Sequence, residues 1–74
     1  MIFPGKETVR RLRREYPAGT RVALILMEDP AAPPTGTCGT ILGVDDTGSL
    51  LVSWDNGSGL SVLYGIDAVR KVPK

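Results

Sequence analysis

Apolar side chains recur at helical spacing near the start of the chain. Val9, Leu12 and Tyr16 lie three and then four residues apart, which places them on one narrow stripe of a helix. Residues 5–16 contain no proline and are rich in good helix formers, and Pro17 disfavours helical geometry just before it. The pattern predicts a helix of about three turns over residues 5–16, which must dock on a larger body to be stable.

After this helix, the spacing of apolar residues becomes that of strands. Short runs of aliphatic and β-branched residues alternate with clusters of turn residues. The strands that we expect are residues 21–27, 37–44, 50–54, 60–64 and 69–72. Glycines within the second run, Gly39 and Gly43, indicate bulges, bends or close backbone approach. Between the first two runs, residues 28–35 contain three prolines and two acids, which predicts a stiff exposed loop.

Two tight turns are expected between the later strands. Gly48 ends an Asp-Asp-Thr-Gly segment and tolerates the positive φ of a type I turn with a bulge. Asn56 and Gly57 form the strongest short hairpin signal, because both residues accept the positive φ of a type I′ turn.

Alternation gives two of the strands one apolar face each. These faces carry Leu50, Val52 and Trp54 in one strand, and Leu60, Val62 and Tyr64 in the next. Five strands with a long first connection and two tight hairpins match the order of an SH3-like barrel. We therefore expect a single mainly β domain over residues 1–74, with the helix followed by a five-stranded SH3-like barrel at 20–73. An open OB-like meander is the alternative, for which the roughly fifty residues after the helix are few.

Composition narrows the range of functions. The chain has 74 residues, one cysteine and no histidine, which excludes an intrachain disulfide and leaves too few soft ligands for a zinc site. No apolar run approaches the length of a membrane span, and the first residues lack the pattern of a signal peptide. We expect a cytoplasmic, monomeric protein with no cofactor, no metal and no membrane partner.

The net charge of +1 hides an asymmetry along the chain. Residues 1–16 carry five basic and two acidic side chains, whereas residues 17–74 carry four basic and six acidic ones. The basic charge is therefore concentrated in the predicted helix, and the remainder of the chain is net acidic.

Four motifs together indicate a family. They are Tyr-Pro-Ala-Gly-Thr-Arg-Val at 16–22, Met-Glu-Asp-Pro at 27–30, Gly-Val-Asp-Asp at 43–46 and Trp-Asp-Asn-Gly-Ser at 54–58. The chain with these motifs resembles a small bacterial family, domain-of-unknown-function family 4314, common in Gram-positive bacteria and their mobile elements. The resemblance covers the whole chain and implies a context but no activity. The Gly-Thr-x-Gly-Thr and Trp-Asp-Asn-Gly pieces also look like those of SH3-like modules of ubiquitin ligases, which bind peptides.

Aromatic and acidic residues suggest a peptide groove. SH3-like barrels bind extended peptides with aromatics beside the first loop, and here Trp54 and Tyr64 each end a strand. A tryptophan in so small a domain is also a natural core residue, so Trp54 either lines the groove or belongs to the core. Glu28 and Asp29, in the proline-rich loop, would border the groove and favour a basic ligand.

Arginines in the predicted helix suggest a second function. Arg10, Arg11, Arg13 and Arg14 could neutralise phosphates of a nucleic acid. The alternative to a binding role is that the arginines form only the solvated face of the helix. In that case Glu7 and Glu15 pair with the arginines at three to four residue spacing. The mobile-element context implied by the resemblance favours a nucleic-acid-binding accessory protein as the alternative to a protein or peptide adaptor.

Catalysis is not expected. Cys38 has no histidine to generate its thiolate and is predicted to be a passive small side chain. Asp45 and Asp46 are adjacent in a turn, where aspartate commonly bonds the backbone and neighbouring side chains point apart. The sequence thus predicts a non-enzymatic interaction module whose partner it does not name.

Overall fold

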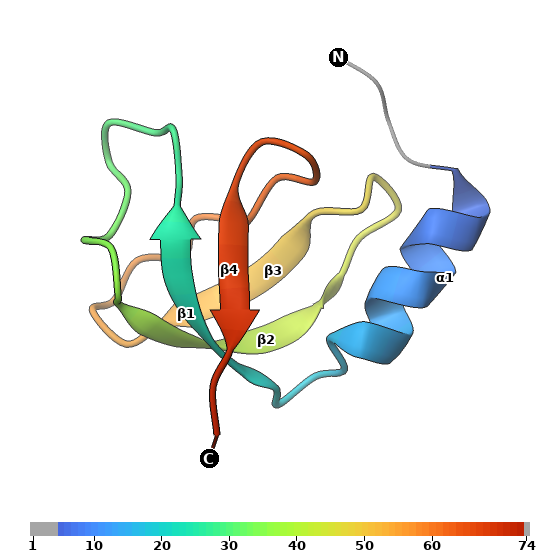
Figure 1. Ribbon diagram of the computed structural model, residues 1–74, viewed down its shortest axis with the longest axis horizontal. Helices are drawn as coiled ribbons and strands as arrows, with labels where there is room; N and C mark the ends of the chain where they lie inside the picture. Colours follow the sequence, from blue (N-terminus) through green and yellow to red (C-terminus); the bar gives the residue numbers. More distant parts are fainter. Residues whose placement is uncertain (1–4, 74) are drawn as a thin grey trace.

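The computed structural model describes residues 5–73, which form one helix and four strands (Figure 1). The elements are α1 (Lys6–Glu15), β1 (Arg21–Leu26), β2 (Cys38–Val44), β3 (Leu50–Trp54) and β4 (Ala68–Lys71). The expected mainly β architecture with one short helix is confirmed, and the proline-rich segment 28–35 is an irregular loop. None of these elements is a helix long and apolar enough to cross a bilayer.

The four strands form one open antiparallel sheet in the order β3-β2-β1-β4. The last strand therefore returns to pair with the first, on the side away from β2 (Figure 1). The register between β2 and β3 shifts between Ile41 and Gly43, so the bulge predicted from the glycines of this strand is present. Gly39 marks a close approach, because a Cβ at this position would lie within 3 Å of the Val52 and Trp54 side chains of β3.

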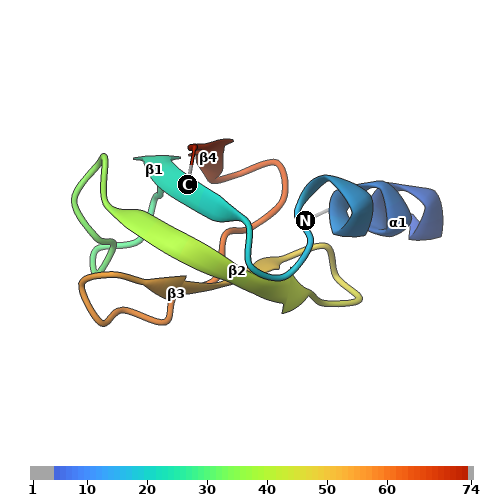
Figure 2. The ribbon, with the colours of Figure 1, turned by 90° about the horizontal axis from the view of Figure 1, so that it is seen from below.

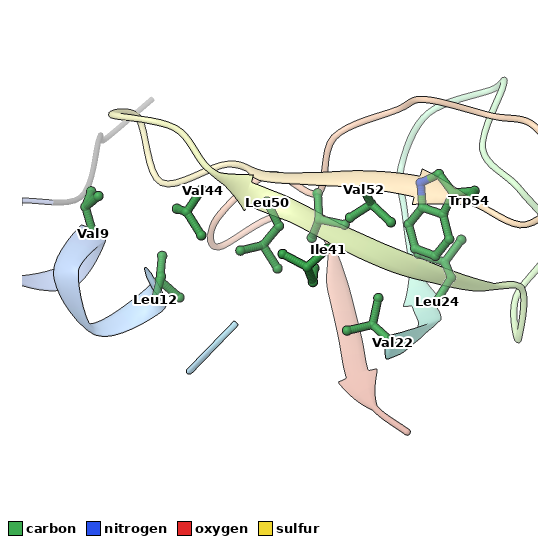
Figure 3. Close-up of a cluster of buried hydrophobic side chains, with 10 residues drawn as sticks. Val9, Leu12, Val22, Leu24, Ile41, Val44, Leu50, Val52 and Trp54 are labelled. Atoms are coloured by element: carbon green, nitrogen blue, oxygen red, sulfur yellow. The ribbon is translucent and has the colours of Figure 1, made fainter. Parts of the chain in front are cut away.

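Buried side chains form one continuous row from α1 at one end to Trp54 at the other (Figure 3). Leu50, Val52 and Trp54 are buried while the residues between them are exposed, which confirms the predicted alternation in β3. Ile41 and Val22 are completely buried at the centre of this row. Burial of this one face of the sheet is the main source of stability in so small a domain.

Helix α1 docks through its predicted stripe. Val9 and Leu12 are buried in the core and Tyr16 packs against it from the helix end. Arg13 fastens the same side, because its Nε donates to the Val44 carbonyl at 3.1 Å and its Nη2 lies 3.0 Å from a carboxylate oxygen of Asp46. The helix stands out at one end of the molecule, with its opposite side turned away from the sheet (Figure 2).

The predicted fifth strand over residues 60–64 does not form, and the five-stranded SH3-like barrel is not confirmed. Only one bridge remains, in which the amides and carbonyls of Leu50 and Val62 bond each other at 2.9 Å. The neighbouring backbone groups bond side chains instead. The Leu60 carbonyl accepts from the Trp54 indole, and the Leu63 amide donates to Asp67. Residues 60–64 thus meet β3 at this single bridge, and the sheet is open.

The turn after β3 also differs from its prediction. Gly57 has a φ of 91°, but no other residue of the turn has a positive φ, so a type I′ turn at Asn56-Gly57 is wrong. The Gly57 amide donates to the Trp54 carbonyl, and the Trp54 amide to the Ser58 carbonyl. Residues 45–49 show the same pattern around Gly48, where the type I turn with a bulge is confirmed.

Candidate functional site

A depression of about 350 Å³ lies between the residues that follow β1 and the segment 60–67. We call it the acidic groove, and it is lined by Met27, Glu28, Asp29, Leu60, Ser61, Leu63, Ile66 and Asp67. Its apolar part is accessible, because Leu63 is 40% and Ile66 38% exposed. Three carboxylates and no basic side chain of residues 5–73 belong to its lining, so its potential is negative.

Asp67 connects the two walls of the acidic groove. One carboxylate oxygen accepts the Glu28 amide at 3.3 Å, and the other accepts the Leu63 amide at 2.9 Å. The Asp67 amide in turn donates to the Leu63 carbonyl at 3.0 Å. Asp67 therefore fixes the spacing of the walls, and sequence reasoning missed it because nothing in the hydrophobic pattern distinguishes it from a turn aspartate.

Glu28 and Asp29 stand on the β1 wall, whereas the sequence predicted that they border a groove formed by Tyr64 and Trp54. Both side chains are exposed. Asp29 also organises the loop, because its Oδ1 accepts the Ala31 amide at 2.8 Å and its carbonyl accepts the Ala32 amide. A carboxylate held in this way needs little reordering to meet a cation.

Trp54 is a core residue and does not line the acidic groove, so of its two predicted roles the structure supports the one in the core. Its side chain is 2% exposed, and its indole nitrogen donates to the Leu60 carbonyl at 2.9 Å. Because Leu60 belongs to the groove lining, Trp54 supports the groove from inside the core.

Tyr64 is exposed at 43%, yet it is not part of the acidic groove. It lines a shallower neighbouring depression of about 220 Å³ between α1 and β4, together with Tyr16 and core residues. Leu63 and Asp67 line both depressions. The predicted set of Tyr64, Trp54, Glu28 and Asp29 is thus divided among two surface depressions and the core.

The profile of one protein family matches the chain over residues 5–72, which is nearly its whole length. That family is described as a domain of unknown function, DUF4314. The chain belongs to the DUF4314 family. Comparison with curated proteins and with solved structures gave no match. Membership confirms the family resemblance of the sequence motifs and assigns no activity, so the function of this DUF4314 domain must be argued from its surface.

The four arginines of this DUF4314 domain have unequal roles. Arg13 is engaged with Val44 and Asp46 as described above. Arg10 pairs with Glu7 at 3.3 Å, but the two side chains are 67% and 90% exposed, so water screens this contact. Arg11 and Arg14 are exposed and form no ion pair within residues 5–73. All four predicted arginines are therefore exposed, and Arg13, at 48%, is the one that also bonds the sheet and the turn after it.

Acidic residues of the turns are occupied by structural contacts. Asp45 Oδ1 accepts from the Thr47 amide, the Thr47 hydroxyl and the Ser49 amide at 2.7 to 3.0 Å. Asp55 takes two hydrogen bonds from the Arg21 guanidinium, which lower the pKa of its carboxyl. Within residues 5–73 no cluster of three or more Cys, Asp or Glu side chains is arranged to hold a metal ion.

Stability should depend on pH through Asp45. The hydrogen bond from the Thr47 hydroxyl is the largest cause that lowers the pKa of Asp45, and burial opposes it. Because the folded-state pKa is below the unfolded value, the stabilisation is present above the unfolded pKa and is lost as pH falls through the folded pKa. We expect Asp45→Asn to cost about 1 kcal/mol at pH 7, since charge-assisted bonds become neutral ones.

The difference in the free energy of unfolding between the unmodified protein and Asp45→Asn should shrink as the pH is lowered from 5 towards 2. Urea unfolding of both proteins across that range measures it. The Arg21–Asp55 pair is present in both proteins and cancels in the comparison. A difference that stayed constant with pH would show that the Asp45 charge contributes nothing.

Proposed function

We propose that this domain is a non-enzymatic interaction module that binds an extended basic segment of another protein in the acidic groove. One observation carries the proposal: Leu63 and Ile66 are exposed side by side with Glu28, Asp29 and Asp67 in a single depression. Exposed apolar side chains rimmed by polar groups are typical of protein interaction sites. Carboxylates around them select a partner of opposite charge.

The size of the acidic groove favours a peptide side chain as its occupant. Its volume of about 350 Å³ is at the lower end of ligand pockets, which are roughly 300–1,000 Å³. One aliphatic side chain of a partner would lie on Leu63 and Ile66, while lysines or arginines beside it in the partner reach Glu28 and Asp29. The contact area is small, so we expect a weak, transient complex.

The strand order also supports a peptide-binding role. The pairing of β4 with β1 places the end of β1, the following loop and residues 60–67 together. SH3-like modules bind extended peptides beside the corresponding first loop, and we propose that this open sheet is a reduced relative of that architecture.

A peptide series tests the proposed function. The probe is a labelled decapeptide with one leucine flanked by lysines in a Gly-Ser background, compared with a peptide in which glutamate replaces lysine. We expect fluorescence anisotropy to detect binding of the lysine peptide alone. The double variant Glu28→Gln with Asp29→Asn should weaken binding about fivefold, because exposed ion pairs contribute roughly 0.2–1 kcal/mol each.

The matched control is the double variant Glu7→Gln with Glu15→Gln, which removes the same charge from α1. It should leave the affinity for the lysine peptide unchanged within about twofold, because screening limits the reach of exposed charges. Equal losses in the two double variants, or equal binding of both peptides, would exclude the acidic groove as the binding site.

A further inference from the structure

The outward side of α1 is a basic surface that the acidic groove does not use. Arg10, Arg11 and Arg14 are exposed, and they lie on neighbouring positions of the helix at spacings of three and four residues. We call these three residues the arginine face. The helix as a whole carries five basic and two acidic side chains, whereas the rest of the chain is net acidic.

The arginine face is rigidly presented. On the inner side, Val9 and Leu12 are buried, and Arg13 bonds Val44 and Asp46 across the helix–sheet contact. At the C-terminal end of the helix, the Lys71 ammonium lies 5.1 Å from the ring centre of Tyr16, a further contact between α1 and the sheet. A docked helix loses little further entropy when its exposed side binds a ligand.

The basic helix and the proline-rich loop with Glu28 and Asp29 lie apart in the fold. Helix α1 stands at one end, and the loop that follows β1 lies at the opposite end in both views (Figures 1 and 2). That loop carries Glu28 and Asp29 of the acidic groove. The acidic groove nevertheless reaches towards α1, because its Leu63 and Asp67 also line the depression that Leu12 and Tyr16 border. Attraction of a polyanion therefore comes from the exposed arginines of α1 themselves.

We infer that the arginine face binds the phosphate backbone of duplex DNA. Guanidinium groups match phosphate oxygens bidentately, and the three arginines lie within about 6 Å along the axis of α1. The major groove of B-DNA is about 12 Å wide and admits a helix, whereas that of A-form RNA is too narrow for side chains to read. This function is independent of the peptide-binding function proposed above.

The composition of α1 limits the mode of binding. The helix Lys-Glu-Thr-Val-Arg-Arg-Leu-Arg-Arg-Glu has no aromatic residue on which a base could stack, which disfavours single strands. It also has no asparagine or glutamine to read adenine. Because arginine can also read guanine, independence of sequence follows from the proposed phosphate contacts and not from the composition of α1. The exposed Arg10–Glu7 pair is weak enough to be exchanged for a phosphate.

Salt dependence tests this inference. With a labelled 20-base-pair duplex and the full chain, three phosphate contacts predict a slope of about −2.7 in log affinity against log salt. Affinity should then fall about 40-fold between 50 and 200 mM salt. The triple variant Arg10→Gln, Arg11→Gln, Arg14→Gln should lose at least tenfold in affinity at 50 mM salt, and the triple lysine variant should retain most of it.

Single variants give the matched control. Arg11→Gln and Arg70→Gln remove the same charge from exposed positions, one on the arginine face and one on β4. We expect severalfold weaker DNA binding for the first variant and a change within about twofold for the second, with unchanged melting temperatures for both. Equal effects of the two variants would overturn the inference, because binding would then follow net charge alone.

Three other polyanions test whether the arginine face prefers duplex DNA. Duplex RNA, single-stranded DNA and vesicles of anionic lipid should each bind more weakly than duplex DNA at equal salt. Binding of any of them as tight as that of duplex DNA would overturn the assignment. The groove variant Glu28→Gln with Asp29→Asn should bind DNA at least as well as the unmodified chain, so the two functions fail or succeed separately.

Discussion

Replacing Trp54 by alanine should remove most of the stability of the domain. The side chain is 2% exposed at one end of the core, and large-to-small changes of a buried tryptophan cost roughly 3–5 kcal/mol. A chain of this length has a total stability of about 4–11 kcal/mol at typical values per residue. We expect the melting temperature, followed by far-UV circular dichroism, to fall by roughly 15–30 °C.

A second variant at this position separates packing from hydrogen bonding. Trp54→Phe keeps an aromatic ring in the core but leaves the Leu60 carbonyl without the indole donor. The expected cost is about 1–2 kcal/mol, which is well below that of alanine. If Trp54→Ala unfolded at nearly the same temperature as the unmodified protein, Trp54 would not be the core residue that the structure describes.

Adding one methyl group at Gly39 should be almost as damaging. A Cβ built there would lie 2.7 Å from Val52 Cγ1, 2.8 Å from Trp54 Cε3 and 3.0 Å from the Ser53 carbonyl oxygen. The carbonyl belongs to the backbone of β3 and cannot move without disturbing the pairing with β2. We expect Gly39→Ala to cost about 3 kcal/mol in urea unfolding, the upper end for overpacking a core.

Gly43 of the same strand provides the control. A Cβ at Gly43 would meet no atom within 4 Å, and its backbone φ is not positive. Gly43→Ala should therefore lie within about 0.5 kcal/mol of the unmodified protein. Similar costs for the two substitutions would mean that glycine is needed in β2 for flexibility, not for the close approach of Gly39 to β3.

Most elements of the fold could be predicted because each is encoded by local periodicity. The stripe of α1 and the alternation of β3 depend on residues close in sequence, and both are present. The fifth strand had the same alternation at residues 60–64 but did not form. There, the Trp54 indole takes the Leu60 carbonyl, which would otherwise face β3, and this side-chain contact leaves no periodic signal.

The functional surfaces were predictable to a lesser degree. Charge counts along the chain located the acidic loop and the basic helix, because both are contiguous in sequence. The sequence did not reveal the apolar part of the acidic groove. Leu63 and Ile66 lie in a turn, and the orientation of that turn depends on the hydrogen bond between Leu63 and Asp67. Arg13 was grouped with its neighbours, although only the packing of α1 on β2 shows that this arginine is a structural contact.

Chemical-shift mapping of the labelled domain with the lysine decapeptide would locate peptide binding directly. We expect the amide signals of residues 27–29 and 60–67 to shift progressively with peptide concentration, while those of α1 stay in place. The glutamate peptide should cause no shifts in the acidic groove. Shifts confined to other surfaces, or none at millimolar concentrations of the lysine peptide, would contradict the assignment of the acidic groove as a binding site for basic segments.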